Sequence, residues 1–126
     1  MSSGYGKFEV LEWVDLQETP NHVYALLKGF LERQDANRFI SLTTSLPAED
    51  EIRNVIEGST YALIRRGGFI QSESFSKTPL KKLTQFFFAA GSTFLRPYKG
   101  DVYNVAPNGN HPVYRYSKPI LLGVDL

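Results

Sequence analysis

Apolar residues recur with a helical period early in this 126-residue chain. One face, with the spacing i, i+3, i+4, i+7 and i+8, is made by Val23, Leu26, Leu27, Phe30 and Leu31. A hydroxyl cap, Thr19, and a proline suited to the first helical position, Pro20, precede this face. We therefore predict a helix over about residues 20–34. Gly29 inside it costs about 1 kcal/mol relative to alanine, which is consistent with a close packing neighbour.

Other segments are short and rich in aromatic and β-branched residues, which is typical of strands. Strands are predicted at residues 8–14, where the alternation slips after Val10, at residues 38–44 and near residues 69–75. Residues 120–124 form a last apolar segment, which predicts another strand or a docked tail.

A β-hairpin is predicted near the end of the sequence. Residues 102–105 and 113–116 have strand composition, and the loop between them carries Asn108 and Gly109. An Asn-Gly pair favours the left-handed backbone conformations that tight hairpin turns need.

The middle of the chain is compatible with a second helix. Three acids at residues 49–51 follow Pro47, and negative charge is favourable at the start of a helix. Apolar positions from Ile52 onwards continue one helical face as far as Leu63. The last turn would hold two arginines and a glycine cap, which are Arg65, Arg66 and Gly67.

A competing interpretation ends that helix at Gly58. Residues 61–66 would then form a strand that turns at Gly67-Gly68 into residues 69–75. In this hairpin both faces would mix apolar and polar residues, whereas the helix has a clean apolar stripe. We therefore favour the helix.

A third helix is predicted over about residues 79–90. A cap and a proline, Thr78 and Pro79, open it, and Gly91 closes it. Its core stripe consists of Leu80, Leu83 and Phe87. Phe86 and Phe88 widen that stripe, so this helix would be buried on more than one side or would present aromatic surface to a partner.

These elements predict a single α+β domain at residues 7–126, after a flexible tail at residues 1–6. About three helices would pack on one face of a largely antiparallel sheet, in the order βαβαβαββ, with a C-terminal β-hairpin. The length suits one domain. No segment has the pattern of a signal peptide or of a membrane-spanning helix, and cysteine is absent, so we expect a soluble, intracellular protein.

The sequence carries no catalytic signature. Motifs for serine nucleophiles, zinc hydrolases and phosphate-binding loops are missing, so we expect a protein that is not an enzyme and that uses no cofactor or metal. The two histidines, His22 and His111, are isolated in sequence. The acids at residues 49–51 could offer metal-binding oxygens, but the helix dipole explains them well enough.

A small net charge of +1 conceals two oppositely charged halves. Residues 1–63 hold five cations and ten acids, a net −5, and residues 64–126 hold nine cations and three acids, a net +6. The two halves could intermix on one folded surface. Alternatively, the molecule is bipolar and its basic side meets an anionic partner.

The basic half also interleaves cations with aromatic rings, a pattern that suits phosphates and stacked bases. We predict a nucleic-acid-binding surface formed by Lys77, Lys81, Lys82, Arg96, Lys99, Tyr103, Tyr114, Arg115, Tyr116 and Lys118. In the simpler interpretation, the aromatics are core residues and the lysines are merely solvated. The alternative function is a protein–protein assembly or adaptor subunit, including a homo-oligomer, anchored by Phe86, Phe88 or Phe94.

Overall fold

The computed structural model describes residue 6, residues 8–70, residues 80–106, residue 108 and residues 111–126. Within these residues it contains two helices and nine short strands. In chain order they are α1 (His22–Glu32), β1 (Arg38–Ser41), α2 (Ile52–Ile56), β2 (Leu63–Arg66), β3 (Phe69–Ile70), β4 (Leu80–Lys81), β5 (Gln85–Phe88), β6 (Thr93–Phe94), β7 (Val102–Asn104), β8 (Tyr114–Tyr116) and β9 (Leu121–Val124).

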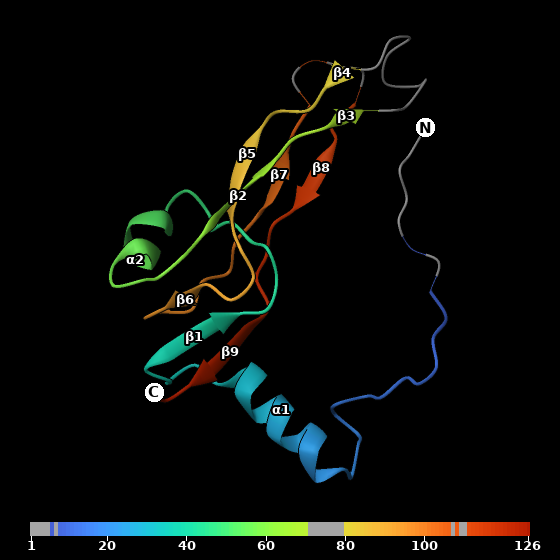
Figure 1. Cartoon of the computed structure of the whole chain (residues 1–126), viewed down its shortest axis with the longest axis vertical. Helices are drawn as coiled ribbons and strands as arrows, with labels where there is room; N and C mark the ends of the chain where they lie inside the picture. Colours follow the sequence, from blue (N-terminus) through green and yellow to red (C-terminus); the bar gives the residue numbers. More distant parts are fainter. Residues whose placement is uncertain (1–5, 7, 71–79, 107, 109–110) are drawn as a thin grey trace.

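The strands form one three-stranded sheet and three two-stranded ribbons, all antiparallel. The sheet has the order β6-β1-β9, with Phe39 of β1 opposite Phe94 on one side and Gly123 on the other. The ribbons are β2–β5, β3–β4 and β7–β8. Figure 1 shows the sheet and α1 at one end of the molecule and the ribbons extending away from them.

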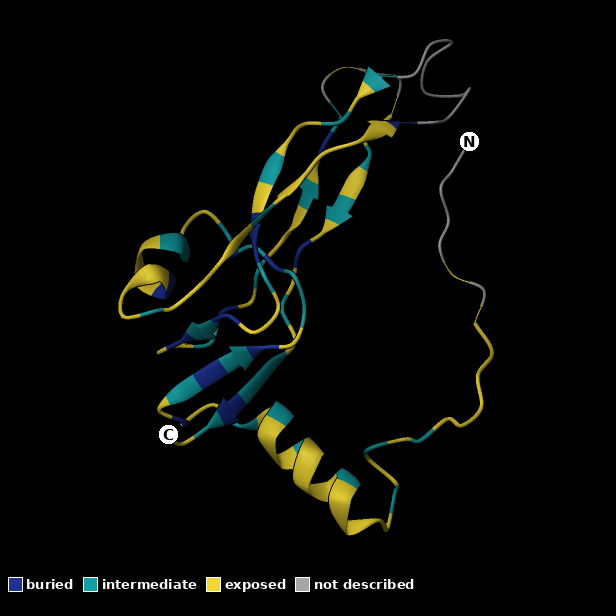
Figure 2. Cartoon of the chain, in the orientation of Figure 1, coloured by how far each residue is buried: buried dark blue, intermediate teal, exposed yellow. Residues whose placement is uncertain are grey.

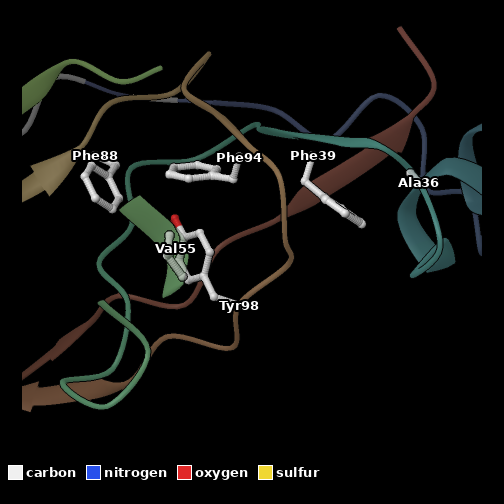
Figure 3. Packing of buried hydrophobic residues seen from close by; sticks show 6 residues of the cluster. All are labelled: Ala36, Phe39, Val55, Phe88, Phe94 and Tyr98. Carbon is white, nitrogen blue, oxygen red and sulfur yellow. The ribbon is translucent and has the colours of Figure 1, made fainter. Parts of the chain in front are cut away.

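The hydrophobic core lies where the sheet meets the ribbons. Phe94 of β6 is fully buried, with ring centroids 5.2 Å from Phe88 of β5 and 5.1 Å from Tyr98. Such tilted and edge-on aromatic pairs add about 0.5–1.5 kcal/mol beyond the area that they bury. Figure 3 shows these three rings beside Val55 of α2, and Phe39 leading from them toward the end of α1.

Hydrogen bonds also stabilise the core around Phe88 and Tyr98. The Tyr98 hydroxyl lies 2.6 Å from the Ser45 hydroxyl, and both side chains are buried. Ser45 and Phe88 also exchange two backbone hydrogen bonds, of 3.1 and 2.9 Å. A buried hydroxyl without a partner would cost about 1–3 kcal/mol, so these bonds are needed to keep the core folded.

Helix α1 has the predicted location but not the predicted burial. Its N-cap is Asn21, whose side-chain oxygen accepts a 2.9 Å bond from the Val23 N–H, and Thr19 lies just outside it. None of its eleven residues is buried, and a side chain on Gly29 would have no neighbour within 4 Å. Figure 2 shows a helix that is almost entirely exposed.

The predicted fold class is wrong. The described residues hold two helices, and the prediction of about three helices packed on one face of a sheet does not fit them. The predicted third helix is β4 and β5, because the apolar residues from Phe86 to Phe88 pair across a ribbon with β2. A run of consecutive aromatic residues is compatible with the helical period and with the strand period alike. Pairing with the distant strand β2 determines that this segment is a strand. Thr78 and Pro79 lie outside the described residues.

The middle segment follows parts of both interpretations. The second helix is only Ile52–Ile56 and ends before Gly58, whose φ of +65° is a conformation that glycine adopts easily. Residues 63–66 are a strand, as the alternative proposed, but this strand pairs with β5 rather than with β3. The predicted strand near residues 69–75 is described only for Phe69–Ile70.

Four other predicted elements can be compared directly with the structure. Residues 8–14 are not in a strand, which contradicts the prediction. The strand after α1 is confirmed as β1, and the last apolar segment is confirmed as a strand, β9. The C-terminal hairpin is confirmed as β7–β8. Neither described helix is long and apolar enough to cross a membrane.

Candidate nucleic-acid interface

The three ribbons, β2–β5, β3–β4 and β7–β8, form one structural unit that we call the ribbon arm. Ribbon β7–β8 is joined to the other two by the Leu83 N–H, which donates to the Val105 carbonyl at 2.9 Å. Ribbons β3–β4 and β2–β5 are joined near the Lys82 N–H, which donates to the Gly68 carbonyl at 2.8 Å. Side chains on the three ribbons therefore have fixed relative positions.

Arg115 of β8 holds the ribbon arm together. Its guanidinium donates to the Arg66 carbonyl and to the Gln85 side chain, both at 3.2 Å, and to the Gly67 carbonyl at 3.4 Å. It also lies 5.8 Å from the centre of the Phe87 ring. Burial, and then the charge of Arg66, lowers the pKa of Arg115, although a guanidinium remains charged at neutral pH. Both terminal nitrogens of the guanidinium therefore already donate hydrogen bonds within the ribbon arm.

Tyr103 of β7 is also used structurally. Its hydroxyl donates a 2.6 Å bond to the Pro47 carbonyl, and its side chain is half-buried. Burial raises the pKa of Tyr103, and the nearby charge of Asp101 adds to this effect. The prediction that Tyr103 and Arg115 contact nucleic acid therefore conflicts with the contacts that both side chains already make.

Two cation–aromatic pairs face solvent on the ribbon arm. Arg65 of β2 lies directly opposite Phe86 of β5, and Lys81 of β4 lies directly opposite Phe69 of β3. Side chains opposite each other on antiparallel strands share a face and lie about 4.5–5.5 Å apart at Cβ. Phe86 is 56% exposed and Phe69 is 59% exposed, so both rings are available to a partner.

Sequence reasoning found this geometry only in part. Lys81 was predicted as a binding residue, but Arg65 was assigned to the end of a helix and Phe69 was not singled out. Phe86 was proposed only as a protein anchor, together with Phe88 and Phe94, and these last two are core residues. The strand interpretation of residues 61–66 places Arg65 in a strand, as observed, but pairs that strand with residues 69–75 instead of with β5.

A second exposed aromatic pair lies on β8. Tyr114 is 66% exposed and Tyr116 is 71% exposed, and residues two apart in a strand point to the same face. Arg115 lies between them and points to the opposite face, into the ribbon arm. Lys118 follows on the same chain and is exposed. The two tyrosines therefore have the exposure that base stacking requires.

The remaining predicted residues are divided between two regions. Lys82 is half-buried near β3. Arg96 lines a groove of about 280 Å³ with Asp50 and Glu51, and Lys99 lines a groove of about 490 Å³ with residues at the end of α1. Those two cations thus lie among acids and apolar side chains rather than on the ribbon faces. Lys77 lies outside the described residues.

No group of three or more potential metal ligands occurs in the part of the chain that the structure describes. The carboxylate that reaches both grooves, Glu51, accepts backbone bonds from Ala48, Lys99 and Gly100 at 2.9–3.0 Å. Its oxygens are therefore occupied by the fold. What the geometry offers is a surface of cations and exposed rings.

Comparison with known proteins identifies the family of this chain. Residues 34–124 match the family model described as CRISPR Csm4 C-terminal domain. The chain belongs to this family. It is 38% identical over 123 residues to the CRISPR system Cms protein Csm4 of Mycobacterium tuberculosis (strain CDC 1551 / Oshkosh), a match that covers 98% of this chain and 37% of that protein.

Csm4 relatives from other organisms match over nearly the whole chain as well. The protein of the same name from Streptococcus thermophilus is 30% identical over 126 residues, which is 99% of this chain and 39% of that protein. The one from Methanocaldococcus jannaschii is 29% identical over 136 residues, or 96% of this chain and 34% of that protein. This chain therefore spans somewhat more than a third of the length of these relatives. Their names state a CRISPR system and no enzymatic activity.

Proposed function

We propose that the ribbon arm binds single-stranded RNA as part of a CRISPR assembly. The observation that carries this proposal is two solvent-facing cross-strand pairs of a cation and an aromatic ring, Arg65 opposite Phe86 and Lys81 opposite Phe69. A cation can neutralise a phosphate while the neighbouring ring stacks on a base, and stacking contributes about 1–3 kcal/mol per base. Tyr114 and Tyr116 supply two further rings.

Membership of a CRISPR family supports RNA as the ligand. In RNA-guided CRISPR effectors, base pairing of a guide RNA reads the sequence, and protein subunits bind its backbone and shape. A surface that combines cations with flat rings suits this task, because every base has a face on which an aromatic ring can stack. The overall +6 charge of residues 64–126, which contain the ribbon strands from Ile64 onwards, adds long-range attraction for RNA.

Fluorescence anisotropy with labelled single-stranded RNA tests this proposal. In Arg65→Glu/Lys81→Glu the affinity should fall at least tenfold, and the slope of log affinity against log salt should flatten by about one unit per lost cation. The matched control is Lys28→Glu/Arg53→Glu, which makes the same change of charge on α1 and α2. Its affinity should change much less.

Three outcomes would contradict the proposal. The unmodified chain could fail to bind any RNA at low salt, the two double variants could lose affinity equally, or duplex DNA could bind as tightly as single-stranded RNA. Thermal melts of each variant show whether a loss of binding reflects a loss of folding. Arg65 and Lys81 make no recorded side-chain hydrogen bond within the described residues, so both variants should fold.

Protein–protein assembly is the second candidate function, and α1 favours it. Its apolar side chains are exposed by 67% at Val23, 51% at Leu26 and 41% at Phe30. A helical apolar face left uncovered in this way commonly marks a docking surface. Light scattering on the same samples measures whether the chain self-associates, which is the homo-oligomer that the sequence also allowed.

A further inference from the structure

Residues 8–16, which we call the N-terminal segment, expose an unusual amount of apolar surface. Phe8, Leu11 and Trp13 are 86–89% exposed, and Val10 is 63% exposed. The segment belongs to no helix or strand, and Figure 1 shows it running from α1 along the outside of the molecule. No hydrogen bond between residues 8–14 and the rest of the described chain is recorded. The fold of this chain therefore does not account for the apolar side chains of the segment.

The apolar face of α1 is a second surface that the fold leaves uncovered. Val23 is 67% exposed and Leu26 is 51% exposed, although both belong to the face that the helical period predicts for burial. The chain that follows the helix contacts the sheet, because Arg33 and Ala36 pack against Gly123 of β9. Figure 1 shows the first turns of α1 pointing away from that sheet. Helices in proteins are stabilised mainly by packing of such an apolar face, so α1 lacks its usual support.

The two surfaces are held together at the root of the N-terminal segment. Asp15 forms a turn there, because its side chain accepts from the Gln17 N–H at 2.8 Å and its carbonyl accepts from the Thr19 N–H at 3.1 Å. The Gln17 side chain donates to the Glu32 carboxylate, at the end of α1, at 3.2 Å. The segment thus starts beside α1, and one partner can contact both.

Charge shows what kind of partner these surfaces fit. Residues 8–32 carry five acids and a single cation, Lys28. Two of the acids, Glu9 and Glu12, lie between the exposed apolar residues of the segment. Negative charge repels the phosphates of a nucleic acid, so the RNA of the ribbon arm does not suit this surface. The surface fits a protein that presents apolar side chains bordered by cations.

The relatives indicate which protein this is. The family model of the Csm4 C-terminal domain begins at residue 34, just after α1. The match to the Mycobacterium tuberculosis Csm4 covers 98% of this chain, so it includes most of the N-terminal segment and α1. The larger part of that protein lies outside the match. In such a protein, the segment and α1 stand between the C-terminal domain and the part of the polypeptide that precedes it.

We propose that the N-terminal segment and the apolar face of α1 form one docking surface for the N-terminal part of a Csm4 protein, which is the part that precedes the C-terminal domain. Large side chains such as Phe8, Leu11 and Trp13 are the anchors, because a few buried aromatic and apolar groups supply most of the free energy of binding. The acids around them pair with cations of the partner. This proposal rests on the second candidate function, protein assembly, and names the partner.

A chimaera with the Mycobacterium tuberculosis Csm4 tests this docking. This chain replaces the part of that protein that it matches, and the preceding part is kept. Hydrogen exchange then compares the chimaera with this chain alone. The α1 amides should exchange about tenfold more slowly in the chimaera, because docking adds to the free energy of local opening. The amides of β7 and β8, on the ribbon arm, are the control and should exchange equally in both.

Glutamate substitutions on opposite sides of α1 show whether the apolar face is responsible. Val23→Glu/Leu26→Glu places two charges on that face and should abolish the added protection in the chimaera. Ala25→Glu/Gly29→Glu places two charges on the other side of the helix and should leave the protection unchanged. In this chain alone, both double variants should melt near the natural midpoint, because all four positions are exposed.

Thiol labelling tests the N-terminal segment separately, because the natural chain has no cysteine. The thiol of Leu11→Cys should react with a maleimide about tenfold more slowly in the chimaera than in this chain alone. Leu83→Cys, between β4 and β5, is the control, since this position is 50% exposed on the ribbon arm. Its thiol should react at the same rate in both. Peptide mass spectrometry distinguishes each engineered thiol from any in the Mycobacterium tuberculosis part.

Three results would overturn the proposal. Equal α1 exchange and equal Leu11→Cys labelling in the chimaera and in this chain alone would show that the surface stays open. Protection of α1 that rises with the concentration of this chain alone would make a second copy the occupant. Loss of protection at the Phe88 amide in the chimaera would show that the two parts do not fit together. RNA is absent from all these measurements, so this inference and the proposed RNA binding can fail separately.

Discussion

A single carboxylate, that of Glu51, joins two distant parts of the chain. One oxygen accepts from the Ala48 and Gly100 N–H groups at 2.9 and 3.0 Å, and the other accepts from the Lys99 N–H at 2.9 Å. The start of α2 is thereby fixed to the loop before β7. Gly100 in this loop has a φ of +64°, and a Cβ there would lie 2.8 Å from the Ser117 carbonyl oxygen. The loop therefore requires glycine at that position.

These bonds make stability depend on pH. Burial alone would raise the pKa of Glu51, but the three backbone donors outweigh it, so its pKa lies below the usual value of 4.5. A carboxylate whose pKa is depressed by folding stabilises the native state at neutral pH. That contribution is lost as the pH falls below 4.5 and through the lower pKa of the folded state.

Replacement of Glu51 by glutamine should show this effect in thermal melts. Glu51→Gln should lower stability at neutral pH by about 1 kcal/mol, a value at the low end for charged hydrogen bonds because the carboxylate is only partly buried. The difference from the natural chain should shrink as the pH falls below 4.5. Glu49→Gln, a neighbouring exposed acid, should change neither the midpoint nor its pH dependence. A constant difference at every pH would contradict the assignment.

At the scale of elements, the sequence predicted those features that depend on neighbours in the chain. Helix α1 has its cap and its apolar period within about fifteen residues, and the β7–β8 hairpin has its turn signal between its strands. Strand β5 was missed and strand β2 was only the less favoured alternative, because the two partners lie far apart in sequence. Leu63 pairs with Phe88, and no local pattern records that contact. The apolar runs were therefore assigned to helices.

The residues of the candidate site also divide into those that a local pattern indicates and those that depend on distant partners. Tyr114 and Tyr116 stay predicted binding residues, and both are exposed on the outer face of a local hairpin. The pairing of Arg65 with Phe86 could not be predicted, because it depends on the long-range ribbon. Tyr103 and Arg115 were predicted as ligand contacts, but each has polar partners that only the tertiary structure supplies.

The outer face of the β7–β8 hairpin leads to a prediction at this scale. If Tyr114 and Tyr116 stack on bases, Tyr114→Phe/Tyr116→Phe should keep RNA affinity nearly unchanged, because the rings remain. Tyr114→Leu/Tyr116→Leu should lose about 1–3 kcal/mol for each base that is no longer stacked. Anisotropy at one fixed salt concentration measures both. An equal loss in the two double variants would show that the hydroxyls act instead, and no loss in either would remove these residues from the site.

At the scale of the whole molecule, charge follows the architecture. The acidic half of the sequence supplies residues 8–16, α1, β1 and α2, and the basic half supplies almost all of the ribbon arm. The core joins the two parts through a small group of rings around Phe94. The parts remote from this core, α1 above all, have few buried contacts. Stability should therefore be uneven along the chain.

Native-state hydrogen exchange should reveal this unevenness. The amides of Ser41 and Phe88 are bonded to Ser92 and Ser45 in the core region, and they should exchange only by global unfolding. The amides of α1 should exchange much faster, because the helix buries no residue and isolated helices of eleven residues are marginal in water. If the α1 amides are protected as strongly as that of Phe88, the apolar face of α1 must be covered in solution. Exchange at increasing protein concentration would then distinguish self-association, which raises protection with concentration, from contacts within one chain, which do not.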